Sequence, residues 1–114
     1  MKKILGYTLL LCAGVQSAWA VSSSLPAAQA AAAMEMAKHE GCLSCHSPEE
    51  KIVGPAYVKV AAKYRNDPDA PASLAQSVRN GSQGKWGRAP MPPHPNLKED
   101  DLRTLVRWVL SLQP

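Results

Sequence analysis

The residues best suited to chemistry form a C-x-x-C-H motif at positions 42–46. Two thiols at this spacing can both add to the vinyl groups on one edge of a porphyrin, so the motif indicates covalent attachment of a c-type haem. The histidine that follows the second cysteine is then held next to the iron, where its imidazole can serve as an axial ligand. The sequence therefore predicts thioethers at Cys42 and Cys45 and a proximal iron ligand at His46.

Two other kinds of site share part of this pattern. A thioredoxin-like redox pair also contains C-x-x-C but requires a βαβ context, and the chain has no runs rich in valine and isoleucine that would form the strands. A structural zinc site usually has four Cys or His ligands. The available ones beyond residue 20 do not fall into a two-plus-two spacing: they are His39, Cys42, Cys45, His46 and His94. Haem attachment is the better interpretation.

A second iron ligand must come from elsewhere in the chain. Met34 and Met36 precede the motif on one predicted helix, which is the wrong place to reach across a haem. Met91, in contrast, lies in a loop with prolines on both sides. Because proline fixes its own φ angle, a thioether in this loop has little freedom to move away. We therefore predict Met91 as the distal ligand; the alternative is an exposed loop methionine.

Helices are the elements that must position these residues. Ala27–Glu40 is rich in alanine and is followed by Gly41, a typical helix end. The last helix has three acidic residues in its first turn, where the helix dipole favours negative charge. Its predicted buried face consists of Leu102, Leu105, Val106, Val109 and Leu112. The predicted helices are 27–40, 57–64, 72–80 and 97–112, and 82–95 is an irregular loop rich in glycine and proline. The fold class is therefore all-α, with about four helices around one flat cofactor.

The first twenty residues have the features of a secretory signal peptide. Lys2 and Lys3 precede the apolar run Ile4–Val15, and Ala18-Trp19-Ala20 is a small-x-small cleavage signal. We therefore expect a mature chain that starts at Val21, forms one domain over residues 21–114 and resides in the periplasm. An uncleaved membrane anchor is the alternative, but an apolar run of about a dozen residues is shorter than the roughly 20 needed to span a bilayer.

Charge and cysteine content agree with export. Loss of the two leader lysines reduces the formal net charge from +4 to +2, so the basic composition is no argument for nucleic-acid binding. Cys12 lies inside the apolar run and follows Leu11 rather than a small residue, which disfavours a lipoprotein. No other cysteine remains outside the motif, and no structural disulfide is expected.

Several motifs in one order make the chain resemble a known family. They are Gly41-Cys42-x-x-Cys45-His46, Val53-Gly54-Pro55-Ala56-Tyr57, Asn80-Gly81-Ser82-Gln83-Gly84-x-Trp86-Gly87, Pro90-Met91-Pro92-Pro93 and Trp108-Val109-Leu110-Ser111. This set resembles the small class I bacterial cytochromes of the cytochrome c-551 type, from about Glu40 to the C-terminus. The resemblance implies one haem c per chain, bound through Cys42 and Cys45 with His46 and Met91 on the iron.

The resemblance also implies roles for residues around the haem. The carbonyl of Pro55 would accept a hydrogen bond from the proximal imidazole, which fixes the orientation of the ring. The indole N–H of Trp86 would meet a haem propionate, although a core aromatic would give the same pattern. Tyr64, Leu74 and Val78 resemble haem-packing positions, and core packing alone would also explain them.

Two positions depart from the pattern of the family. Ser77 stands where some relatives have a basic residue near a propionate, so we expect the propionate charge to be less compensated here. His94 stands where relatives often have asparagine, and we expect it to make a local hydrogen bond. We also hypothesise that titration of His94 makes the reduction potential depend on pH near its ordinary pKa of roughly 6.5. A potential that is constant from about pH 5 to 8 would refute this hypothesis.

With an imidazole and a thioether on the iron, no coordination position remains for a substrate, which favours one-electron transfer over catalysis. We expect a monomeric carrier, not an enzyme, between a donor such as a bc1-type complex and an acceptor. The resemblance permits nitrite reductase, a terminal oxidase or cytochrome peroxidase as the acceptor, without choosing among them. A peroxidase-like enzyme with a labile methionine ligand and a permanent cytochrome subunit of a larger complex are the alternatives. No membrane span is expected in the mature chain.

Overall fold

The computed structural model describes residues 25–114; the predicted leader, its cleavage site and Cys12 lie outside this range. The described part is all-α, as predicted. Its elements in chain order are α1 (Ala27–His39), the short 3₁₀ helix η1 (Cys42–Ser44), α2 (Tyr57–Tyr64), α3 (Ala70–Asn80) and α4 (Glu99–Ser111). Between residues 25 and 114 no helix is both long and apolar enough to cross a bilayer.

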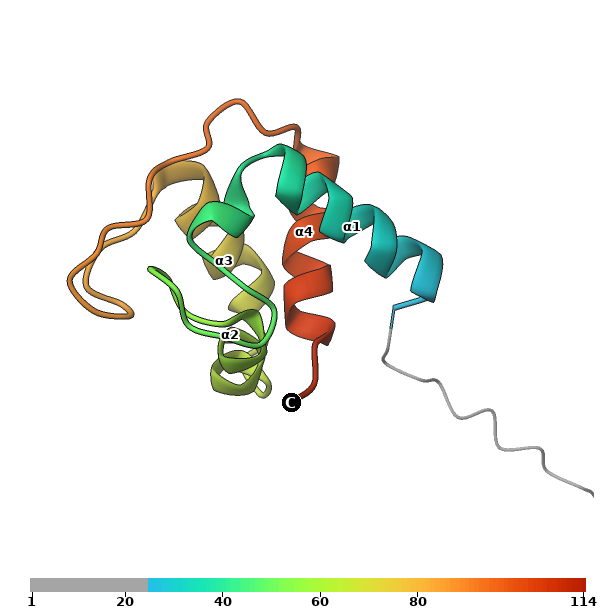
Figure 1. Cartoon of the computed structure of the whole chain (residues 1–114), viewed down its shortest axis with the longest axis horizontal. Helices are drawn as coiled ribbons and strands as arrows, with labels where there is room; N and C mark the ends of the chain where they lie inside the picture. Colours follow the sequence, from blue (N-terminus) through green and yellow to red (C-terminus); the bar gives the residue numbers. More distant parts are fainter. Residues whose placement is uncertain (1–24) are drawn as a thin grey trace, which may run out of the picture.

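Helix α4 is the centre of the fold because it packs against α1, α2 and α3 (Figure 1). Glu99, Asp100 and Asp101 occupy its first turn, where they complement the positive end of the helix dipole. Its buried residues are Leu102, Leu105, Val106 and Trp108. Trp108 was absent from the predicted buried face. It lies three residues after Leu105 and so adjoins the apolar stripe, and its large side chain widens that face.

Small residues allow α1 to approach α4 closely. Ala33 and Ala37 are one turn apart on α1 and are fully buried. The helix ends at His39, and Gly41 then adopts a left-handed conformation with φ of 77°. Glycine adopts this conformation without steric cost, so the chain turns sharply from α1 into the C-x-x-C-H segment.

Helix α3 begins at Ala70, two residues before the predicted start. The prediction assigned Pro71 to the preceding loop because proline interrupts helices. Here Pro71 lies in the first turn, where a missing backbone N–H costs no helical hydrogen bond. The other helices agree with the predicted ranges to within two residues at each end.

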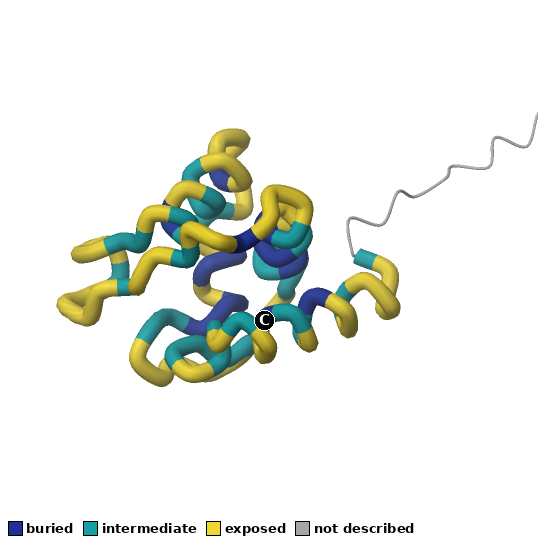
Figure 2. Tube along the Cα trace, turned by 90° about the horizontal axis from the view of Figure 1, so that it is seen from above, coloured by how far each residue is buried: buried dark blue, intermediate teal, exposed yellow. Residues whose placement is uncertain are grey.

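The long loop after α3 is irregular, as its proline content predicts, and most of it is exposed (Figure 2). It folds back on itself at one point. The backbone N–H of Ser82 donates to the Met91 carbonyl at 3.1 Å, and the N–H of Met91 donates to the Ser82 carbonyl at 2.8 Å. This pair of hydrogen bonds sets the position of Met91 relative to the end of α3.

Candidate functional site

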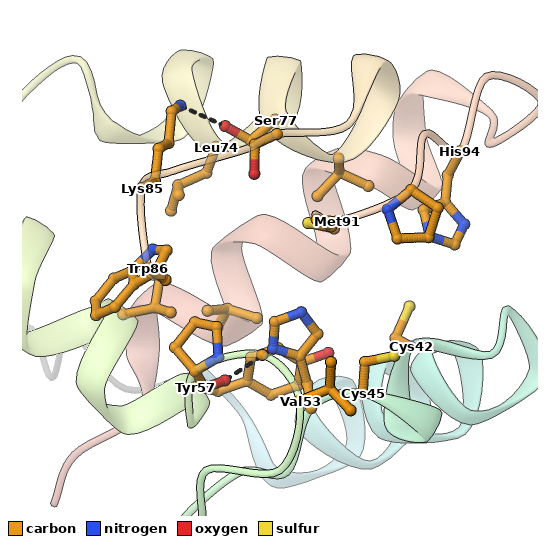
Figure 3. A pocket seen from close by; sticks show the side chains of 18 of the residues that line it. Cys42, Cys45, Val53, Tyr57, Leu74, Ser77, Lys85, Trp86, Met91 and His94 are labelled. Carbon is orange, nitrogen blue, oxygen red and sulfur yellow. Dashed lines mark hydrogen bonds between the residues drawn. The ribbon is translucent and has the colours of Figure 1, made fainter. Parts of the chain in front are cut away.

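A cavity with largely apolar walls lies between the C-x-x-C-H segment, α3, α4 and the loop after α3. Figure 3 shows Cys42 and Cys45 at one end and Lys85 and Trp86 at the other. The predicted site residues all line this one cavity: Cys42, Cys45, His46, Pro55, Trp86 and Met91. Apolar wall residues include Val60, Tyr64, Leu74, Val78, Leu105, Val106 and Val109. The cavity therefore brings together residues that are almost 50 positions apart in the sequence.

The imidazole of His46 is held in one orientation by a backbone carbonyl. Its Nδ1 lies 2.8 Å from the carbonyl oxygen of Pro55. A carbonyl can only accept, so Nδ1 must carry the proton and donate it. The Nε2 atom of the neutral ring then has its lone pair available for a metal ion. A hydrogen bond of this kind orients a metal-binding histidine and raises its basicity.

Tight packing against two residues restricts the same ring. A Cβ atom built on Gly54 would lie only 2.5 Å from Cε1 of His46, so any larger residue at position 54 would displace the ring. The ring of Tyr57 stacks on His46 with centroids 5.0 Å apart. Trp108 in turn contacts Tyr57 edge to face at 5.4 Å. The histidine is therefore supported by the buried core of the protein, to which Tyr57 and Trp108 belong.

The two cysteines are half-buried thiols and are not joined in a disulfide. The turn that holds them is closed by the N–H groups of Cys45 and His46, which donate to the carbonyl of Cys42 at 3.2 and 3.0 Å. Burial raises the pKa of the Cys42 thiol, and the nearby carboxylate of Glu40 raises it further. Both sulfurs lie at the same end of the cavity (Figure 3), where they could bind one edge of a flat cofactor.

Met91 lies on the opposite side of the cavity from the cysteines and Tyr57 (Figure 3). Its backbone is joined to Ser82, and the segment that follows is tied to α3 because the N–H of His94 donates to the Val78 carbonyl at 2.9 Å. The expected local hydrogen bond of the His94 side chain is not among the side-chain hydrogen bonds formed within residues 25–114, where the backbone of His94 makes the bond instead. The imidazole of His94 lines the cavity on the Met91 side.

The end of the cavity opposite the cysteines is positively charged. The ammonium of Lys85 donates to the hydroxyl of Ser77 at 2.7 Å, and the ammonium of Lys63 lies 4.5 Å from the centroid of the Trp86 ring. Serine at position 77 led to the expectation that a propionate would be less compensated in this region. The structure places a lysine from the loop beside Ser77, a contact that residue spacing did not reveal.

This donor set fits a haem c. The two thiols are close together, an imidazole has a free Nε2, and a thioether lies across a space lined by apolar side chains. A zinc centre is not supported, because residues 25–114 contain no group of three or more His, Cys, Asp or Glu side chains arranged to hold a metal ion. The fold and the site together define a small all-α haem protein of the c type.

Comparison with known proteins agrees with this class. The sequence model of the family described as Cytochrome c matches residues 28–113, and the chain belongs to this family. Cytochrome c-552 of Nitrosomonas europaea is 41% identical over 103 residues, which cover 87% of this chain and all of the relative. Cytochrome c-551 of Pseudomonas aeruginosa is 51% identical over 74 residues, or 65% of this chain and 70% of the relative.

Solved structures show the same fold. The crystal structure of wild-type cytochrome c552 from Nitrosomonas europaea has a TM-score of 0.68 and 42% sequence identity, and the match covers 70% of this chain and 99% of that one. The protein is therefore a small class I c-type cytochrome with one covalently bound haem c. As a member of the cytochrome c family, it is an electron carrier rather than an enzyme.

Proposed function

We propose that the protein is a periplasmic one-electron carrier whose haem is attached through Cys42 and Cys45 and bound axially by His46 and Met91. The main support is the geometry of the cavity: the oriented imidazole of His46 lines one side and the Met91 thioether the other. The bound haem supplies one-electron exchange at its iron. The residues of the chain hold the two ligands in place and surround the cofactor with apolar side chains.

Different hydrogen bonds hold each of the two proposed iron ligands in place. On the proximal side, Nδ1 of His46 is hydrogen-bonded to the Pro55 carbonyl. This bond fixes the ring and leaves Nε2 as the nitrogen available to the iron. On the distal side, the Ser82 hydrogen bonds hold the backbone of Met91. With both ligands in place, no position on the iron is left open to a substrate. Such ligation by histidine and methionine favours a high reduction potential.

Trp86 is proposed to hold a propionate of the haem through its indole N–H. It lines the cavity at the end opposite Cys42 and Cys45, and a haem attached by its vinyl edge would direct its propionates there. The ammonium of Lys63 over the indole ring restricts the ring through a cation–π contact. The contact with Lys63 supports a fixed orientation for this side chain.

Contact with redox partners is proposed near the cysteine end of the cavity. Ile52 and Val53 are large apolar residues with 53% and 51% of their surface exposed, and the N–H of Val53 donates to the Cys45 carbonyl. They provide apolar contact area beside the cofactor, suited to a brief encounter that buries less than about 1,200 Å². The proposed partners are a donor such as a bc1-type complex and, as acceptor, nitrite reductase, a terminal oxidase or cytochrome peroxidase.

Residues 1–20 are proposed to be a cleaved signal peptide and residues 21–114 the mature domain, which acts as a monomer. The support is the order of charged, apolar and small residues in the leader. N-terminal sequencing of the holoprotein purified from the periplasmic fraction should begin at Val21. Holoprotein found only in the membrane fraction, with Met1 intact, would contradict this assignment.

Replacement of the distal ligand tests the axial assignment. Met91→Ala should abolish the long-wavelength absorption band of methionine-ligated ferric haem, lower the reduction potential and allow added cyanide to bind much faster. Met36→Leu is the matched control, because Met36 lies on α1 and does not line the cavity. An unchanged spectrum in Met91→Ala would refute the assignment of Met91 to the iron.

The partner proposal requires a separate experiment. Purified ferrous protein should reduce one of the candidate acceptors in stopped-flow mixing, and Ile52→Asp should slow this reaction without changing the spectrum. Arg107→Asp is a control for surface charge, because Arg107 lies on α4 and does not line the cavity. Equal slowing by the two variants would show that the apolar surface near Cys45 is not the contact region.

A further inference from the structure

We propose that Lys85, held by Ser77, binds a propionate carboxylate of the haem and raises the reduction potential of the protein. The proposal rests on the proposed attachment at Cys42 and Cys45, since that attachment decides which edge of the haem faces Lys85. Vinyl and propionate groups occupy opposite edges of this porphyrin. The carboxylates must therefore lie at the end of the cavity that contains Lys85 and Trp86 (Figure 3).

The hydrogen bonds of Ser77 define the roles of the two side chains: the hydroxyl of Ser77 accepts and the ammonium of Lys85 donates. The hydroxyl of Ser77 donates its single proton to the carbonyl of Ser73 at 3.0 Å, so its oxygen is free to accept from Lys85 at 2.7 Å. Ser77 is 9% exposed and is the one polar residue in the buried set of the described chain. An ammonium has three donors, and this contact uses one of them. Two remain for a ligand.

Within residues 25–114, no acidic side chain forms a salt bridge with this ammonium. The salt bridges formed within residues 25–114 join Glu40 to His39 and Glu99 to Arg79 and Arg103, and none includes Lys85. Both Lys85 and Ser77 line the cavity. Lys85 is an exposed residue, but its ammonium is held at the wall of this apolar cavity with donors to spare, so an anionic group on the occupant would find a partner there. A haem propionate is an anion of this kind.

Lys85 is the better propionate partner of the two lysines at this end. The ammonium of Lys63 lies over the rings of Trp86 and Tyr64, at 4.5 and 5.5 Å from their centroids, and Lys63 does not line the cavity. Lys85 comes from the loop, yet its ammonium reaches back to α3. It thus spans the gap between the two segments that enclose this end of the cavity.

The charge of Lys85 has a predictable effect on the iron. A nearby positive charge disfavours the ferric state, which has one more positive charge than the ferrous state. Neutralisation of a propionate acts in the same direction. Loss of the Lys85 charge should therefore lower the reduction potential while the axial ligands and the spectrum remain the same.

Redox titration of the holoprotein tests the proposal. Lys85→Met should shift the one-electron equilibrium toward the ferric form by about threefold to tenfold, which corresponds to a potential lower by roughly 30–60 mV at 59 mV per tenfold change. Lys85→Arg should retain the wild-type potential. In the double variant Lys85→Met, Ser77→Arg, a cation supplied from α3 should restore most of the loss, which a purely structural role of Lys85 would not predict.

Lys59→Met is the matched control, because it removes the same charge from an exposed residue of α2 that does not line the cavity. A shift in Lys85→Met no larger than that in Lys59→Met would overturn the proposal. So would a holoprotein structure in which no propionate oxygen lies within hydrogen-bond distance of the Lys85 Nζ. Absence of the methionine band from the wild-type spectrum would instead contradict the axial ligation, which separates the two failures.

Discussion

The two sides of the cavity are held by different forces. On the proximal side, His46 is confined by the close approach of Gly54 and by the ring of Tyr57, which contacts the buried Trp108. On the distal side, Met91 lies in an exposed loop held by backbone hydrogen bonds of Met91 to Ser82 and of His94 to Val78 in α3. One ligand thus depends on packing in the core, and the other on a few polar contacts near the surface.

This difference predicts different responses to perturbation. A change under His46 alters buried packing, so it should lower the stability of the whole domain. Loss of a hydrogen bond that holds the Met91 loop should permit local opening of the loop, since exposed segments with few buried contacts open at lower free energy than the core. The proximal bond is therefore coupled to global unfolding, whereas the distal bond can be lost while the fold persists.

Among the variants that test this difference, Trp108→Ala should cause the largest loss of stability. Trp108 is 2% exposed and supports the Tyr57 ring, and truncation of a buried aromatic residue costs about 3–5 kcal/mol. Guanidinium unfolding of the ferric holoprotein, followed by circular dichroism, measures the loss. Trp108→Phe is the control and should retain most of the stability because it keeps a ring against Tyr57. Equal losses in the two variants would show that a ring in contact with Tyr57 is not what supports the proximal side.

Gly54→Ala should disturb the proximal side through one added methyl group. This Cβ would lie 2.5 Å from Cε1 and 2.9 Å from Nδ1 of His46, and forced overpacking typically costs about 1–3 kcal/mol. Displacement of the ring should also weaken the hydrogen bond to Pro55 and change the absorption spectrum. Gly84→Ala is the control: its φ of +77° imposes backbone strain, but its Cβ meets no atom within 4 Å. If Gly54→Ala leaves the spectrum as unaltered as Gly84→Ala does, the proposed restriction of His46 is wrong.

Much of the fold could be predicted from the sequence because glycine and proline mark the helix ends and apolar spacing marks the buried faces. The start of α3 was missed because a proline in a first helical turn looks the same in sequence as a proline in a loop. The burial of Trp108 was missed because the apolar stripe of α4 is wider than strict helical spacing suggests. In both cases tertiary packing, which no local pattern contains, decided the outcome.

The candidate site also has a part that the sequence predicted and a part that it did not. The residues proposed to bind the haem lie in short motifs with a chemical reason for their spacing, and the structure brings them to one cavity. The contacts of Lys85 with Ser77 and of Arg79 with the carbonyls beyond His94 join different elements through long flexible side chains. Such side chains have many rotamers, and their partners are fixed only when the elements have packed.

Arg79→Met should weaken the distal side selectively. In α3, Nη1 of Arg79 donates to the carbonyls of Pro95 and Leu97 at 3.1 and 3.0 Å, which anchors the end of the Met91 loop. Loss of these charge-assisted bonds should cost about 1–2 kcal/mol, because part of the group is solvated. On heating, the methionine band should disappear in this variant well before circular dichroism reports unfolding.

Arg103→Met is the matched control for Arg79→Met. It removes an arginine that also binds Glu99, but none of the bonds to the loop carbonyls. The methionine band and the circular dichroism signal should keep their wild-type order of loss in this control. Simultaneous loss of both signals in Arg79→Met would mean that Arg79 supports the whole domain and not the loop alone.

Glu99→Gln should have the smallest effect and should depend on pH. Hydrogen bonds from Arg103 and Arg79 lower the pKa of the Glu99 carboxyl below its ordinary value of 4.5. Because the folded state has the lower pKa, the carboxylate stabilises the fold above pH 4.5, and this contribution is lost as the pH falls through the folded pKa. Wild type should thus be slightly more stable than Glu99→Gln at neutral pH and equal to it in acid, and thermal melts at several pH values measure the difference. Glu99 also accepts a hydrogen bond from Arg79. A small early loss of the methionine band in Glu99→Gln at neutral pH would therefore connect this surface ion pair to the distal ligand. No change in the band would show that the two carbonyls alone anchor Arg79.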